Sequence, residues 1–347
     1  MKLKKREYCM VSGTTRKGWK GKLMNLLILL VLLSSVIPYL RTALDASTER
    51  ELLQSLAVTS HQYHTKGFVP VRNQFELPPP PDDLLVQQSD RIYHRREWDA
   101  APVVLEDYKL VFFTTAKVGC TVWKQLFRRM MGYGNWRTTN GKQMLPWDPD
   151  YNGLKYLYDY NRTTANHMLT DPSWTRAIVV RDPKERFLSA YLDKVVQNPF
   201  FTNKCCCPKH RNCVSPQTTF SEFFDLVQTC ENAHWAPQSR RMEAKYFPYL
   251  NFVGRMETIA QDAKALLIRI GAWEDFGKSG WGAQGDEAIF QPHHEPIHAT
   301  RAQDRLRSYY TPELEAKVDH YCYMDYQVPY LGLKRTTLFA DNATATS

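Results

Sequence analysis

Residues 108–124 read Tyr108-Lys-Leu-Val-Phe-Phe-Thr-Thr-Ala-Lys-Val-Gly119-Cys-Thr-Val-Trp-Lys124, and this stretch decides the fold. The run 110–113 is β-branched and aromatic, which predicts a short buried strand. Residues 122–131 have the apolar spacing of a helix, and Gly119 permits a tight loop between the two elements. The sequence therefore predicts a strand-to-helix junction with a polar loop.

The loop of this first junction has the features of a phosphate site. Backbone N–H groups of residues 118–121 would point out of the helix N-terminus, where the helix dipole favours an anion. Lys117 adds a positive charge and Thr121 a hydroxyl donor. The residues predicted to bind phosphate here are Lys117, Val118, Gly119, Cys120 and Thr121. The pattern Gly-x-x-x-x-Gly-Lys-Ser/Thr is absent, so a solvated loop lysine is the alternative for Lys117.

A second junction follows farther along and reads Arg176-Ala-Ile-Val-Val-Arg181-Asp-Pro-Lys-Glu-Arg-Phe-Leu-Ser189-Ala-Tyr. Residues 178–180 predict a strand, Asp182 suits the N-cap and Pro183 suits the first helical position. Arg181 would clamp a second phosphate through its planar guanidinium, with Ser189 donating a hydroxyl. The alternative is that Arg181 pairs with a carboxylate and Ser189 only packs.

Strands and helices also alternate along the rest of the chain. The pattern predicts a third strand at 251–253 and helices at 220–228, 259–270 and 312–321. Such alternation is typical of an α/β fold with a mostly parallel sheet flanked by helices on both faces. Open sheets of this kind bind ligands at the C-terminal ends of their strands. Two cationic junctions therefore suit a ligand with two separate phosphate groups.

At these residues the sequence resembles the membrane-bound carbohydrate sulfotransferases of the Golgi, the family that includes the HNK-1 and chondroitin 4-O sulfotransferases. Residues 117–124 are similar to the family's 5′-phosphosulfate loop, and residues 181–191 are similar to its 3′-phosphate segment. The resemblance covers roughly residues 105–333 and includes His234-Trp-Ala-Pro-Gln238, residues 252–258, residues 309–314 and Met324-Asp-Tyr. Ala116, Val122 and the cysteine-rich residues 205–213 depart from the family's pattern.

The resemblance implies a P-loop-like sulfotransferase fold. It also implies transfer of a sulfuryl group from 3′-phosphoadenosine 5′-phosphosulfate to a glycan or proteoglycan hydroxyl, without a metal. Charge grows on the bridging oxygen of the departing phosphate, so a cation near that oxygen is the most useful protein group. Lys117 is predicted for this role, and Lys124 either reinforces it or is an exposed helical lysine. The alternative function is an inactive lumenal glycan-binding or scaffold protein with the same fold.

The acceptor hydroxyl needs a general base, which typically accelerates such reactions by about 10²- to 10⁴-fold. His234 is the first candidate, because it lies in a polar loop before the third predicted strand. His167 is the second, since a similarly placed histidine is the base in the related uronyl 2-O-sulfotransferases. A carboxylate and His293, His294 and His298 remain as further candidates. Each histidine could instead be structural.

Charge and hydropathy divide the chain into five regions. Residues 1–22 hold eight Lys or Arg and one Glu, which leaves only +2 of the net +9 for residues 23–347 and argues against a nucleic-acid partner. Residues 23–40 carry no charge and, at about 27 Å as a helix, just span a bilayer. We expect a basic cytosolic tail at 1–22, a type II signal-anchor helix at 23–40, a stem at 41–105, a catalytic domain at 106–335 and a tail at 336–347. A cleaved signal peptide is the alternative.

The part of the chain beyond the predicted membrane helix is expected in the Golgi lumen. It carries the glycosylation sequons Asn161-Arg-Thr and Asn342-Ala-Thr and seven of the eight cysteines. The candidates for disulfide bonds are Cys205, Cys206, Cys207, Cys213, Cys230 and Cys322. Zinc binding through Cys207, His210 and Cys213 is the alternative to a loop held by disulfides.

Overall fold

A computed structural model describes residues 78, 83–95, 100–138, 149–207, 212–291 and 300–339. Within these residues the strands are β1 Val103–Leu105, β2 Leu110–Phe113, β3 Lys155–Tyr156, β4 Thr175–Val180 and β5 Phe252–Arg255. They form one sheet in the order β3-β1-β2-β4-β5. Strands β2, β4 and β5 are parallel, whereas β1 is antiparallel to both of its neighbours.

The helices confirm the periodicity of the sequence to within a residue at most ends. The predicted helices at 220–228, 259–270 and 312–321 are α8 Phe220–Val227, α9 Ile259–Arg269 and α11 Pro312–Tyr321. The two junction helices are α3 Cys120–Met130 and α6 Pro183–Tyr191. The other helices are α4 Pro149–Asn152, α5 Arg162–Thr170, α7 Pro199–Cys206, α10 Ala302–Tyr309 and α12 Tyr323–Gln327.

The sheet is mixed rather than mostly parallel, because β1 and β3 add an antiparallel half. β1 turns back through Glu106–Tyr108 and pairs with β2, so that Leu105 lies opposite Leu110. Lys109 closes this turn in the left-handed conformation, at φ 45°. Strands of two and three residues are too short for hydrophobic alternation to reveal them in a sequence.

The folded body begins earlier than the predicted boundary at residue 106. Val86 and Ile92 lie in the predicted stem, yet both are fully buried in one apolar cluster with Ala165 and Leu169 of α5. The predicted regions 1–22 and 23–40 and the last residues of the chain lie outside the described residues. In the part of the chain that the structure does describe, no helix is long and apolar enough to cross a membrane.

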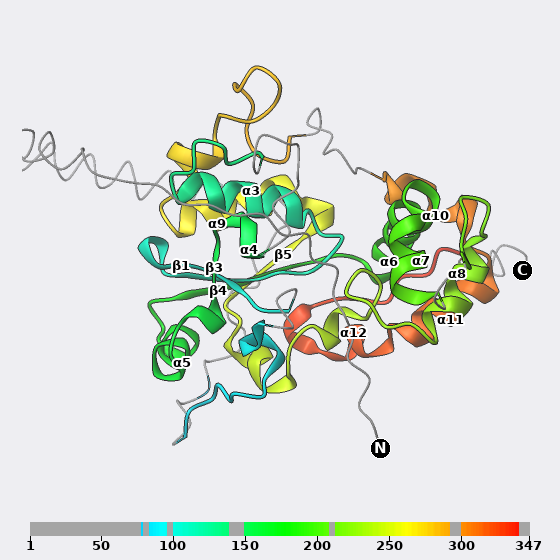
Figure 1. Ribbon diagram of the computed structural model, residues 1–347, viewed down its shortest axis with the longest axis horizontal. Coiled ribbons are helices and arrows are strands. Elements are labelled where there is room, and N and C mark those ends of the chain that lie inside the picture. Colours follow the sequence, from blue (N-terminus) through cyan, green and yellow to red (C-terminus); the bar gives the residue numbers. More distant parts are fainter. Residues whose placement is uncertain are drawn as a thin grey trace, which may run out of the picture. The chain divides into compact units, whose positions relative to one another are not determined.

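Helices cover both faces of the sheet (Figure 1). Alternate strand residues pack with α3 and α9 on one face and with α5 on the other. Trp123 of α3 is fully buried, with its ring 4.9 Å from the ring of Phe112 in β2. Burial of a large apolar side chain contributes roughly 1.5–3 kcal/mol. This packing fixes the N-terminus of α3 at the C-terminal end of β2.

A third apolar cluster lies among the helices that follow β4. Helices α6, α7, α8, α10 and α11 gather to one side of the sheet (Figure 1), and Phe187 and Trp235 are buried between them. Asp182 caps α6, because its side chain accepts hydrogen bonds from the N–H groups of Lys184 and Glu185. The predicted N-cap is therefore confirmed. The cap starts α6 directly after β4, so the first turn of α6 lies at the C-terminal end of this strand.

Candidate active site

The two cationic junctions meet at one edge of the sheet. β2 and β4 are adjacent and parallel, with Phe113 paired to Ile178, so their C-terminal ends point the same way. Lys117 lies in the loop after β2, and Arg181 follows β4 directly. Nη1 of Arg181 donates a hydrogen bond to the carbonyl oxygen of Lys117 at 3.4 Å. The structure thus places at one sheet edge the two residues that the sequence assigns to one ligand.

Two left-handed residues shape the first loop, Lys117 at φ 69° and Gly119 at φ 74°. A Cβ on Gly119 would lie 2.9 Å from the ring of Phe290, so this position requires glycine for space as well as for conformation. Cys120 and Thr121 are half-buried at the first turn of α3. Because the first N–H groups of a helix have no partner within it, this turn offers donors to an anion.

Lys117 is buried, which contradicts the interpretation of a solvated loop lysine. Its Nζ lies 2.7 Å from Oδ2 of Asp193, and the two side chains are only 9% and 8% exposed. Burial lowers the pKa of Lys117, and the Asp193 carboxylate offsets part of that effect. Lys124, one turn into α3, is buried as well, so the interpretation of an exposed helical lysine is also wrong.

Arg181 pairs with a carboxylate, as one of the two interpretations expected. Its Nε lies 3.3 Å from Oε2 of Glu185, and both side chains are largely buried. Burial raises the pKa of Glu185 to about 7, and the charges of Glu257 and Asp182 add to this effect while Arg181 opposes it. Gln238 accepts from the Arg181 N–H at 3.0 Å and donates to its carbonyl oxygen at 2.8 Å. Gln238 therefore holds the backbone of Arg181, while Glu185 and the Lys117 carbonyl oxygen hold its guanidinium.

Ser189 is buried two turns into α6. Its hydroxyl accepts a hydrogen bond from Thr300 at 2.9 Å. Glu185, Ser189 and Asp193 are spaced by four residues, so they lie along one face of α6 and of the π-helical segment Leu192–Gln197 that continues it. One end of this face contacts Arg181 and the other contacts Lys117. Ser189 is therefore placed between the two cations.

The hydrogen bonds of His234 leave Nε2 as the basic nitrogen of its neutral imidazole. Oδ1 of Asn232 accepts a hydrogen bond from the His234 backbone N–H at 3.0 Å and lies 2.7 Å from Nδ1. Because an amide oxygen only accepts, Nδ1 carries the proton and Nε2 the lone pair. Burial, reinforced by the ammonium groups of Lys194 and Lys117, lowers the pKa of His234 well below its usual value. Both effects favour the neutral imidazole, which is the form that a general base requires.

His167 does not join this group. It lies in the last turn of α5, before β4 begins at Thr175, and so at the end of the strand opposite Arg181. At about 3.3 Å per residue, the six residues of β4 separate these ends by on the order of 17 Å. The His167 side chain is 61% exposed and lies 3.3 Å from the carboxylate of Asp171. The three later candidate histidines, at 293, 294 and 298, lie outside the described residues.

Arg186 is a site residue to which the sequence analysis assigns no role. Its buried guanidinium donates to the carbonyl oxygens of Ala116 at 2.9 Å, Ala233 at 2.8 Å and Ala236 at 2.8 Å. It therefore joins the first loop to the loop that holds the candidate base. Arg186 belongs to the segment that resembles the 3′-phosphate segment, but spacing alone does not separate a buried arginine from a solvated one on a helix.

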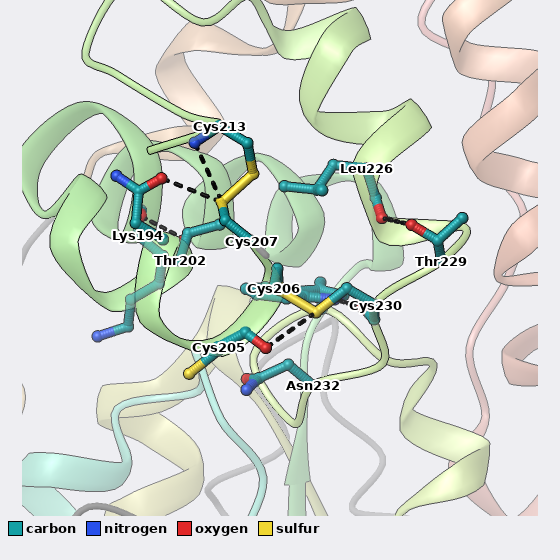
Figure 2. Close-up of a disulfide and its surroundings, with 12 residues drawn as sticks. Lys194, Thr202, Cys205, Cys206, Cys207, Cys213, Leu226, Thr229, Cys230 and Asn232 are labelled. Carbon is teal, nitrogen blue, oxygen red and sulfur yellow. Dashed lines mark hydrogen bonds between the residues drawn. A yellow bond between two sulfur atoms is a disulfide. The ribbon is translucent and has the colours of Figure 1, made fainter. Parts of the chain in front are cut away.

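Two disulfides support the loop that precedes His234. Cys206 is bonded to Cys230 and Cys207 to Cys213 (Figure 2). The first bond ties α7 to the residues just before Asn232. The second contradicts a zinc site that uses both Cys207 and Cys213, and among the described residues no group of three or more His, Cys, Asp or Glu could hold a metal. The thiols of Cys205 and Cys322 are free.

The chain is similar to several carbohydrate sulfotransferases. Carbohydrate sulfotransferase 11 of Danio rerio is 24% identical over 249 residues, which are 66% of this chain and 65% of the relative. Carbohydrate sulfotransferase 11 of Rattus norvegicus is 34% identical over 186 residues, 48% of this chain and 51% of the relative. Carbohydrate sulfotransferase 9 of Homo sapiens is 24% identical over 259 residues, 68% of this chain and 54% of the relative. The chain thus spans less than two thirds of the length of each relative.

No solved structure matches the chain. The model of the Sulfotransferase family, in contrast, matches residues 102–328. That range is most of the described structure, and it contains both cationic junctions and His234. The chain therefore belongs to the sulfotransferase family.

Proposed function

We propose that this protein is a carbohydrate sulfotransferase, which moves a sulfuryl group from 3′-phosphoadenosine 5′-phosphosulfate to a hydroxyl of a glycan or proteoglycan. The observation that carries the proposal is that Lys117 and Arg181 lie at the same sheet edge, where the Arg181 guanidinium donates to the Lys117 carbonyl oxygen. A nucleotide with phosphates at both its 5′ and 3′ positions would contact both cations. The names of the relatives support a carbohydrate as the acceptor.

In this proposal the first junction holds the 5′ end of the donor. The N–H groups of residues 118–121 and the Thr121 hydroxyl donate to the anion at the start of α3. Lys117 supplies its positive charge where negative charge develops on the departing phosphate. Lys124 lies on the same first turns of α3 and adds to the positive field.

The second junction holds the 3′ end. Arg181 is a planar donor suited to two phosphate oxygens, and the Ser189 hydroxyl lies along the same face of α6. Donor binding would then replace the contact between Arg181 and Glu185, or share the guanidinium with it. His234, with its lone pair on Nε2, accepts the proton of the acceptor hydroxyl.

The proposal includes a Golgi location, with a type II membrane anchor at 23–40 and the described body in the lumen. The two disulfides suit an oxidising compartment. Asn161 of the first sequon is exposed and caps α5 through Oδ1, so a glycan on Nδ2 would leave the cap in place. Treatment with a glycosidase tests the lumenal location: it should lower the mass of the protein, and Asn161→Gln should make this decrease smaller.

Removal of the Lys117 charge tests the activity itself. We expect Lys117→Ala to reduce transfer of labelled sulfate to a glycan panel by at least about 10³-fold, because a preorganised charge beside the reacting group is lost. Lys278→Ala is the matched control, since the Lys278 side chain is 62% exposed and pairs with Glu274 on the surface. Donor binding by the wild type without product on any acceptor would contradict the proposal and favour an inactive glycan-binding protein.

A further inference from the structure

We propose that Asp193 is the positioning residue that holds the Lys117 ammonium in its charged form beside the phosphate loop. The proposal rests on the proposed function, in which that charge meets the departing phosphate. Asp193 follows the segment that resembles the 3′-phosphate segment and has no role in the binding of the donor proposed above. Its importance comes from where the structure places its carboxylate.

One oxygen of Asp193 contacts two ammonium groups. Oδ2 lies 2.7 Å from Nζ of Lys117 and 3.2 Å from Nζ of Lys194. The Lys194 ammonium also lies 4.7 Å from the centroid of the Phe201 ring, which fixes it independently. All three charged side chains are at most 16% exposed. The carboxylate is therefore the counter-charge of two cations in a site with little solvent.

A change of helical pitch brings Asp193 to this place. α6 ends at Tyr191 and continues as the π-helical segment Leu192–Gln197, in which the Asn198 N–H donates to the Asp193 carbonyl oxygen at 3.0 Å. π-helical turns of this kind are frequent at functional sites. Because Asp193 lies on a helical element rather than a loop, its carboxylate is held rigidly toward Lys117.

Burial and charge act on Lys117 in opposite directions. Burial favours the neutral amine and lowers the pKa of Lys117, whereas Asp193 raises it and Lys194 lowers it further. The charged and titratable groups that face Lys117 are Asp193, Lys194, Cys120, Arg181 and His234. Among the groups that favour its charged form, Asp193 has the largest effect. Without this carboxylate, Lys117 would lose its proton at a lower pH.

The test is the pH profile of an Asp193→Asn variant, which keeps the shape of the side chain and removes its charge. We expect the rate of sulfate transfer to fall by about tenfold at pH 6.5 and by about 100-fold at pH 8.5, because the neutral amine of Lys117 accumulates as the pH rises. Asp193→Glu restores a carboxylate and should recover most of the rate at pH 8.5. A loss of activity by the same factor at every pH would overturn the proposal.

Two further variants separate charge from structure. A guanidinium stays charged throughout this pH range, so in a Lys117→Arg background the binding of 3′-phosphoadenosine 5′-phosphate should have the same pH dependence with Asp or Asn at position 193. Lys194→Gln removes a repelling charge, so the ratio of its activity at pH 8.5 to that at pH 6.5 should exceed the wild-type ratio. If Asp193→Asn does not fold, an unchanged ratio in Lys194→Gln overturns the proposal by itself.

Calorimetry with 3′-phosphoadenosine 5′-phosphate distinguishes this proposal from the proposed function. Wild-type protein that binds the nucleotide but forms no sulfated product refutes the transfer reaction. Binding by Asp193→Asn that weakens between pH 6.5 and 8.5 more than binding by the wild type still supports the role of Asp193. Equal weakening in the two proteins overturns it, whatever the activity.

Discussion

At each end of β4 a basic side chain lies beside an aspartate, but the surroundings differ. At the C-terminal end, Lys117 and Asp193 form a pair whose side chains are 9% and 8% exposed. At the N-terminal end, His167 and Asp171 form one whose side chains are 61% and 26% exposed. An exposed pair contributes about 0–1 kcal/mol, whereas removal of one partner from a buried pair destabilises by about 3–5 kcal/mol. Burial, rather than residue type, therefore distinguishes the functional edge of the sheet.

The two histidines give the largest expected contrast between these ends. We expect His234→Gln to lower the rate of sulfate transfer by about 10³-fold, because glutamine keeps polarity and size but provides no base. His167→Gln, at the exposed end, should change the rate by less than about twofold. Steady-state rates with saturating donor, compared with donor binding by calorimetry, measure both effects. A large loss in His167→Gln with an intact His234→Gln would reverse the assignment of the base.

A substitution of Arg186 tests whether activity depends on the link between the phosphate loop and the loop that holds His234. We expect Arg186→Lys to lower the rate by about 10²-fold, because one ammonium cannot reach the three carbonyl oxygens that lie around the guanidinium, and misplacement of the two loops follows. Unfolding in urea should show a loss of about 2–3 kcal/mol from carbonyl groups left without a donor.

Arg162 offers a control for Arg186. It lies on α5, away from the functional edge, and donates to Val86 O at 3.0 Å. Arg162→Lys should leave the rate of sulfate transfer unchanged even where it lowers stability. Equal losses of rate in the two variants would show that general destabilisation, rather than the junction of two loops, explains the result for Arg186.

The local elements of the functional edge were predictable from the sequence, because each depends on neighbouring residues. The strand at 110–113, the cap at Asp182 and the left-handed Gly119 all follow from local patterns. The pairing of Lys117 with Asp193 and the contacts of Arg186 join residues far apart in the chain. The spacing of residues in the sequence does not show which distant residues come into contact in the fold.

The same reasoning explains the differences between the predicted and the observed arrangement. Only a short segment separates His167 from Arg181 in the sequence. That segment contains β4, so the two residues lie at opposite ends of this strand. The antiparallel half of the sheet was missed because β1 and β3 are short. Residues 83–95, which precede the predicted boundary at residue 106, pack through a few separated side chains and contain no regular strand or α-helix, so the sequence pattern does not reveal this packing.

The smallest expected effect is on the pH dependence of ligand binding, which we expect to differ between the Arg181 end and the Lys117 end of the site. Burial raises the pKa of Glu185 to about 7, so this carboxyl is partly protonated at neutral pH and ionised at pH 8.5. A phosphate that binds Arg181 disfavours the ionised form, so binding takes up a proton and weakens as the pH rises. Adenosine 3′-phosphate, which carries only the 3′ group, should therefore bind about tenfold more weakly at pH 8.5 than at pH 7.

The phosphate is already a dianion above pH 7, since its second pKa is about 6, so the ligand does not contribute to this change. Glu185→Gln should reduce the change to less than about twofold, because glutamine does not titrate. Adenosine 5′-phosphate, which reports on the Lys117 end, should keep its pH dependence in Glu185→Gln and alter it in Asp193→Asn. Both substitutions could instead change the pH dependence of adenosine 3′-phosphate and adenosine 5′-phosphate binding alike. That result would show that the carboxylates of Glu185 and Asp193 act as one coupled charge. In that case, the functional edge is a single electrostatic site rather than two adjoining ones.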